Sequence, residues 1–132
     1  MIKQAVETGV IDVVAYQVNM ANHKLPGRDE TLRLCAEHGI GVVAMKPFAR
    51  GKLLQGGKTV KIAKYQTGGI TVDAKIPASV TPIRCPNYVL SQPAVCTTIA
   101  GVSSLDELHS ILAYPKASQE EKDYSQSLEE LF

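Results

Sequence analysis

The segment 10–51 constrains the fold of this chain more than any other part of it. Its pattern predicts a strand over 10–19, a helix that Gly39 ends, and a second strand over 40–45. Pro47 cannot donate to a strand ladder, so the second strand stops before it. Two strands joined by one helix form a parallel βαβ unit, and such units carry functional residues at the carboxyl ends of their strands.

The remaining elements continue this alternation of helices and strands. In chain order we expect a helix over 2–8 closed by Gly9, a helix from Thr81-Pro82 to about Ser91, a strand over 94–101, a helix over 104–113 and a final helix opened by Ser118. The β-branched content of 10–19 and 94–101 predicts strands that are covered on both faces. Three parallel strands alternating with helices define an α/β fold.

The segment 49–81 is punctuated by glycines between two strand-like pieces, TVKIAKY and ITVDAKI. These pieces predict a small hairpin or an ordered loop, and a long loop inside a compact domain usually has a function. If both pieces joined the main sheet, the chain would be a complete, small flavodoxin-like domain. Otherwise the pattern fits either a doubly wound sheet or part of a (β/α)8 barrel.

Size and composition limit the classes of function. At 132 residues we expect a single domain, 1–132, and the 45% hydrophobic and 20% charged content is that of a soluble globular protein. The net charge of +1 argues against nucleic acid or an anionic membrane as a partner. The sequence has no long apolar run and no signal-like start, so we expect a cytoplasmic location.

The cysteines and histidines are scattered. They are Cys35, Cys85 and Cys96, and His23, His38 and His109. The cysteines form no CxxC pair and the histidines have no ligand spacing, so we expect free, buried thiols and no metal site.

Three segments in register resemble the C-terminal half of an aldo-keto reductase. They are IDVVAYQVNM, CAEHGIGVVAMKPFARGKL and NYVLSQPAVCTTIAGVSSLDEL, and together with their spacing they span nearly the whole chain. The resemblance implies a partial (β/α)8 TIM barrel, with the three strands as strands six to eight and a C-terminal helix. The tail YPKASQEEKDYS resembles a branch of the family whose members continue into a cysteine-rich iron–sulfur segment.

The resemblance also implies what this chain lacks. The family's catalytic tyrosine, lysine, histidine and aspartate sit on the first four strands, so no catalytic residue is expected here. Asp12 and Tyr16 share the sixth strand and are interpreted as structural. The chain would be the cofactor-binding half of an NAD(P)-dependent oxidoreductase acting on aldehyde or ketone groups, and it is predicted to be inactive alone.

The cofactor, NADP or NAD, would be held by residues that match the family's binding loops. These are Gln17, Asn19, Met45, Lys46, Pro47, Phe48, Arg50, Gly51, Gly101, Val102, Ser103, Ser104 and Glu107. Gln17 lies two residues beyond the family's usual glutamine, at Ala15, and Met45 replaces an aromatic residue that stacks on the nicotinamide. Ile111 replaces an asparagine common at the adenine.

Several of these residues have a second interpretation. Gln17 is also expected as a polar residue of the barrel core, and Arg50 and Lys52 as solvated loop charges. Glu107 would repel a 2′-phosphate and accept from a ribose 2′-hydroxyl, which favours NADH, or it would simply cap its helix.

An alternative function is a truncated, non-catalytic remnant that binds a nucleotide or only self-associates. Exposed edges of parallel strands promote association, so a homo-oligomer is expected unless a missing N-terminal half covers them.

Overall fold

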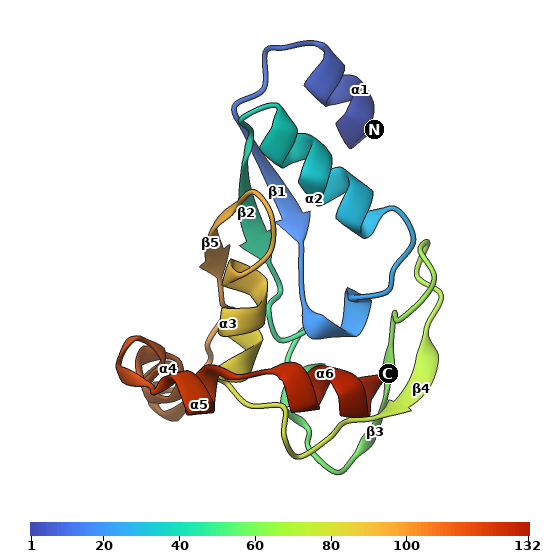
Figure 1. The fold of residues 1–132 in the computed structure, drawn as a ribbon. Helices are drawn as coiled ribbons and strands as arrows, with labels where there is room; N and C mark the ends of the chain where they lie inside the picture. The colour runs from blue at the N-terminus through green and yellow to red at the C-terminus, as the bar shows by residue number, and fades with distance from the viewer.

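The computed structural model describes all 132 residues and contains a three-stranded parallel sheet (Figure 1). The strands are β1 (Val13–Gln17), β2 (Gly41–Met45) and β5 (Val95–Ile99), with β2 in the centre. The helices are α1 (Ile2–Glu7), α2 (Arg28–Glu37), α3 (Arg84–Leu90), α4 (Leu105–Leu112), α5 (Gln119–Lys122) and α6 (Ser125–Leu131), with 3₁₀ turns η1 (Met20–Asn22), η2 (Lys52–Leu54) and η3 (Tyr114–Lys116). The predicted α/β class and the order of strands and helices are confirmed.

The two faces of the sheet differ in burial. Val42 and Ala44 of β2 are fully buried in the core, together with Leu32 of α2 and Val89 of α3. Side chains alternate between faces along a strand, so the residues next to them point to the opposite side. We call that side the open face; it comprises Val13, Ala15, Gln17, Val43, Met45, Thr97 and Ile99.

The prediction that both outer strands are covered on two faces is wrong. Val13 of β1 is 59% exposed and Ile99 of β5 is 61% exposed. The helices α2 and α3 pack on the other face, and no element of this chain packs over these residues. The expectation that Cys96 is buried is also wrong, because this residue of β5 is exposed. Cys35 and Cys85 are buried as predicted.

The segment 49–81, for which a hairpin or an ordered loop was predicted, contains a hairpin. Strand β3 (Thr59–Ile62) pairs antiparallel with β4 (Val72–Lys75) in a sheet of its own. Ile62 and Ala74 anchor the hairpin in the hydrophobic core. Because neither strand joins β1, β2 and β5, the condition for a complete flavodoxin-like domain is not met.

Several predicted boundaries shift for local reasons. The strand predicted over 10–19 ends at Gln17, because the Asn19 side chain caps η1 by accepting from the Asn22 N–H at 3.2 Å. The third strand covers 95–99 rather than 94–101, and Ala94 before it has a left-handed backbone, φ 61°.

Two predicted helices also change. The helix expected from Pro82 begins at Arg84, whose N–H donates to the Thr81 hydroxyl at 3.1 Å. The final helix is divided into α5 and α6, because the Asp123 carboxylate accepts from the N–H and hydroxyl of Ser125 and interrupts the first helix. Ser118 opens α5 with a capping box, as predicted.

A buried polar network joins α2 to α3. Arg28 is fully buried, and its Nη2 donates to the Tyr88 hydroxyl and to the Gln92 Oε1, both at 2.8 Å. The Tyr88 hydroxyl also lies 2.8 Å from the His23 Nδ1. His23 in turn packs against Phe132 at the end of α6, with 6.0 Å between ring centroids. The network therefore ties the two helices to the C-terminus.

Candidate functional site

The last residues of the three parallel strands meet at one edge of the sheet. Gln17 is paired with Met45, and Met45 with Ile99, so these side chains form a row across the open face. The loops that follow the strands surround this row. This edge is where ligands bind in parallel α/β folds.

Two adjoining cavities run along this edge, and we call them together the trough. The first has a volume of about 370 Å³, and the second about 330 Å³. They share Phe48, Gly51 and Gly101, so the two cavities lie next to each other between the β2 loop and α4. Of the predicted cofactor residues, the trough brings together Met45, Lys46, Pro47, Phe48, Arg50, Gly51, Gly101 and Glu107.

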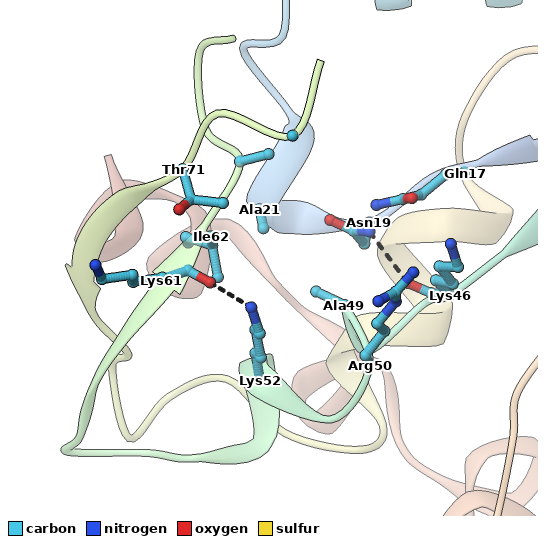
Figure 2. Close-up of a pocket in the computed structure, with 12 residues that line it drawn as sticks. Gln17, Asn19, Ala21, Lys46, Ala49, Arg50, Lys52, Lys61, Ile62 and Thr71 are labelled. Carbon is cyan, nitrogen blue, oxygen red and sulfur yellow. Dashed lines mark hydrogen bonds between the residues drawn. The ribbon is translucent and has the colours of Figure 1, made fainter. Parts of the chain in front are cut away.

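A third cavity of about 280 Å³, the basic pocket, lies on the β1 side of the same edge. The turn after β2 forms one wall, and the β3–β4 hairpin forms the other (Figure 2). Its lining includes Gln17, Asn19, Lys46, Arg50 and Lys52. Lys46 and Arg50 also line the trough, so the two spaces adjoin.

The turn between β2 and η2 has an unusual backbone. Lys46, Ala49 and Arg50 have positive φ angles of 56°, 48° and 60°. Side chains other than glycine disfavour this conformation, so it persists where the surroundings hold it. The Asn19 Nδ2 donates to the Lys46 carbonyl at 3.1 Å, and the Ala49 N–H donates to the same oxygen at 2.9 Å. Fully buried Asn19 therefore supports the turn from behind.

Three polar side chains at or just after the strand ends make no hydrogen bond or ion pair within the protein. The Gln17 side-chain amide is half-buried and takes part in no hydrogen bond within the protein. Lys46 and Arg50 have no carboxylate partner, because the ion pairs of the chain are Arg28–Asp29 and Arg33–Glu37. These three side chains have free donors beside the cavities.

The loop after β5 is organised around α4. The Ser104 hydroxyl accepts from the Glu107 N–H at 3.1 Å, and the Glu107 carboxylate accepts from the Ser103 N–H at 2.6 Å and its hydroxyl at 2.9 Å. These hydrogen bonds from Ser103 lower the pKa of Glu107. The helix-capping interpretation of Glu107 thus matches its contacts. Val102, Ser103 and Ser104 line neither the trough nor the basic pocket.

The trough is polarised along its length. Lys46 and Arg50 lie at one end, and Asp106 and Glu107 lie at the other. Ile111 also lines the second cavity, and its apolar side chain packs against the hydrophobic core. An elongated ligand with an anionic part and a hydroxyl-bearing part would match this distribution of charge.

Some lining residues were missed by the sequence. Leu54, Pro82 and Ser110 line the trough, while Lys61 and Thr71 line the basic pocket. The sequence predicts the hairpin that carries Lys61 and Thr71, but nothing in its pattern says against which strand end the hairpin packs. No three histidine, cysteine or acidic side chains lie where they could hold a metal ion. The structure contains no helix with the length and apolarity needed to cross a membrane.

Comparison with known proteins gives a fold but no close relative. Neither the family models nor the curated proteins contain a match to this sequence. Among solved structures, the holo form of aldo-keto reductase AKR11C1 from Bacillus halodurans is similar, with a TM-score of 0.61 and 22% identity. The similarity covers 98% of this chain and 44% of that protein.

The resemblance to an aldo-keto reductase is therefore confirmed as a likeness of fold. Nearly all of this chain has the fold of part of such an enzyme, and it spans less than half of that enzyme's length.

Proposed function

We propose that this chain is the cofactor-binding half of an NAD(P)-dependent oxidoreductase of the aldo-keto reductase type, acting on aldehyde or ketone groups. The supporting observation is the trough. Residues from the loops after β2 and β5, chosen from the sequence, line two adjoining cavities at the carboxyl edge of a parallel sheet. A fold shared with part of a holo aldo-keto reductase agrees with this function.

In this proposal β1, β2 and β5 are strands six to eight of a (β/α)8 barrel. The open face, with Val13, Ala15, Val43 and Ile99, is then its inner wall. A barrel interior is filled by side chains from all of its strands, so these residues need further strands opposite them. The single domain 1–132 would be completed by a separate N-terminal half or by a second copy of the chain. The catalytic tetrad belongs to the missing strands.

The distribution of charge along the trough favours one direction for a bound dinucleotide. Met45 in the trough would pack on the nicotinamide, which supplies the hydride when it is bound, and Gln17, which lines the adjoining basic pocket, would bind its carboxamide. Lys46 and Arg50 would pair with the pyrophosphate, and Gly51 and Gly101 allow the close approach of the ligand.

The acidic end of the trough favours NADH over NADPH. Hydrogen bonds from Ser103 keep the Glu107 carboxylate ionised, so it repels a 2′-phosphate. Only one of its oxygens is occupied by Ser103, and the other is able to accept from a ribose 2′-hydroxyl.

A titration of the purified chain with NADH and with NADPH, followed by nucleotide fluorescence, tests this function. We expect NADH to bind more tightly, Arg50→Gln to weaken binding by about tenfold, and no reduction of a generic aldehyde. Arg33→Gln is the matched control, because Arg33 lies on α2 outside the trough. If neither nucleotide binds at millimolar concentration, the cofactor-binding function is wrong.

The alternative is a remnant without catalysis, and the exposed apolar side chains of the open face favour it. Such a chain would self-associate through Val13 and Ile99. The intact mass of the native protein separates the two cases. A mass well above 14.2 kDa that includes these peptides would mean that the missing strands belong to the same polypeptide. A mass of 14.2 kDa would favour the remnant or a half-barrel completed by another chain.

A further inference from the structure

We propose that the basic pocket binds the oxyanion of a second ligand, and that the carbonyl substrate is therefore a small molecule bearing a phosphate or carboxylate group. The assignment to the substrate rests on the proposed function, whereas the anion site itself does not.

The charge of the pocket is local and unbalanced. Lys46, Arg50 and Lys52 line it, and no aspartate or glutamate does. The whole chain has 14 basic and 13 acidic residues, so this excess is not a general property of its surface. Lys61 also lines the pocket, but its side chain extends away from the other cations in Figure 2, with its carbonyl toward Lys52.

The hydrogen-bonding groups of the pocket are mostly free donors. The side chains of Gln17 and Thr71 have no partner within the protein, and neither do the head groups of Lys46 and Arg50. Two backbone carbonyls at the pocket are already occupied. The Lys46 carbonyl accepts from Asn19 at 3.1 Å, and the Lys61 carbonyl accepts from the Lys52 ammonium at 2.7 Å. A ligand that only accepts hydrogen bonds, such as an oxyanion, matches this set.

The backbone holds the cations together before any ligand arrives. Lys46 and Arg50 lie at the two ends of the turn with positive φ angles, and both line the pocket. Two neighbouring like charges repel each other, and strained residues other than glycine cluster at binding sites. An anion between them would offset the repulsion, in addition to the support that the hydrogen bonds from Asn19 and Ala49 to the Lys46 carbonyl give the turn.

The pocket is distinct from the trough although the two adjoin. Lys52 and Thr71 line the pocket alone, while Met45 and Gly101 line the trough alone. Lys46 and Arg50 line both spaces, so an anion in the pocket and the cofactor's pyrophosphate in the trough would share these two cations, whereas Lys52 and Thr71 would contact only the anion in the pocket. The cofactor's own phosphate is the competing source of the anion, and the experiment separates the two sources.

The test is a ¹H–¹⁵N NMR titration of the full 132-residue chain with inorganic phosphate, at constant ionic strength, with and without saturating NADH. We expect saturable shifts at Lys52, Gly69 and Thr71, which persist when NADH is present. Lys52→Gln should weaken phosphate binding by about tenfold and leave NADH binding unchanged. Lys75→Gln is the matched control, because Lys75 is an exposed lysine of β4 that does not line the pocket.

Three results would overturn the proposal. They are the absence of saturable phosphate binding, equal weakening by Lys75→Gln, and competition between phosphate and NADH with parallel loss of both in Lys52→Gln. The last result would assign the anion to the cofactor. If phosphate binds in a Lys52-dependent manner and NADH does not bind at all, the anion site stands and the proposed function fails. Thr71→Val, which changes no charge, repeats the test if Lys52→Gln does not fold.

Discussion

The two faces of the parallel sheet differ in how completely this chain covers them. On the helix side, Val42 and Ala44 are buried beneath α2 and α3, and the Arg28–Tyr88–Gln92 hydrogen bonds join those helices. On the open face, Val13 and Ile99 are more than half exposed. The helix side is thus a complete core, whereas the open face has the apolar composition of a core without its second layer.

The difference bears on the proposed function because the trough and the basic pocket lie at the carboxyl edge of the sheet, where the two faces meet. The turn that carries Lys46 and Arg50 is supported by Asn19 and by the core residue Phe48. Their positions therefore depend on the helix side, which this chain supplies. Met45 and Gln17 project from the open face, where Val13 and Ile99 are exposed.

The largest expected effect compares a fully buried leucine of the helix side with an exposed leucine of α4. Leu32→Ala removes a fully buried side chain from α2 and should lower the free energy of unfolding by about 3 kcal/mol. Leu105→Ala truncates a residue of α4 that is 72% exposed and should change it by less than about 0.5 kcal/mol. Urea denaturation measures both. Comparable losses would mean that α4 is covered in solution by another copy or another chain.

A smaller effect is expected from the polar network of the helix side. Tyr88→Phe removes the hydroxyl that accepts from Arg28 and leaves a buried charged donor with less compensation. We expect a loss of about 1–3 kcal/mol. Tyr114→Phe is the control, because the Tyr114 hydroxyl donates to Asn87 at 3.1 Å and does not contact the network. Equal losses in the two variants would show that the network adds nothing to ordinary tyrosine hydrogen bonding.

The sequence predicted the helix side better than the open face, for a physical reason. The spacing of Leu32, Cys35 and Ala36 predicts one buried helix face. Leu32 and Cys35 are fully buried, whereas Ala36 is exposed. The β-branched runs around Val13 and Ile99 are equally apolar, but no element of this chain packs on their second face. The periodicity of a sequence predicts which side chains would face a core, but it does not show whether the residues that pack against them belong to the same chain.

The site divides in the same way. The loops around Met45 and Gly101 were predicted from the family resemblance, and the structure brings them to one trough. The hairpin residue Thr71 was not predicted, because a hairpin's strands are local while its packing direction is tertiary. The burial of Arg28 was not predicted either, because it depends on Tyr88, far away in the sequence.

A pH effect should distinguish the helix side further. Burial, followed by the nearby Arg28 charge, lowers the pKa of His23. The contribution of neutral His23 to stability is therefore complete above its unfolded pKa of about 6.5, and it is lost as the pH falls below that value through the folded pKa. We expect the urea midpoint to be lower at pH 5.5 than at pH 7.5, and we expect this difference to be smaller in the His23→Gln variant. His38→Gln, on the exposed end of α2, should leave it unaltered.

The smallest effect is expected at α4, next to the trough. Hydrogen bonds from Ser103 lower the pKa of Glu107, so its contribution to the start of α4 is present above the ordinary carboxyl pKa of about 4.3 and is lost as the pH falls through its lower folded value. Amide exchange at Leu105–Leu112 should accelerate over that acidic range, and Glu107→Gln should make the exchange less dependent on pH. Glu121, whose carboxylate accepts from the Ser118 N–H and whose N–H donates to the Ser118 hydroxyl at the start of α5, is the internal reference. Since α5 has no part in the trough, added NADH at neutral pH should protect α4 and leave α5 unchanged. Equal protection of both helices would mean that the ligand acts on the whole fold rather than at the trough.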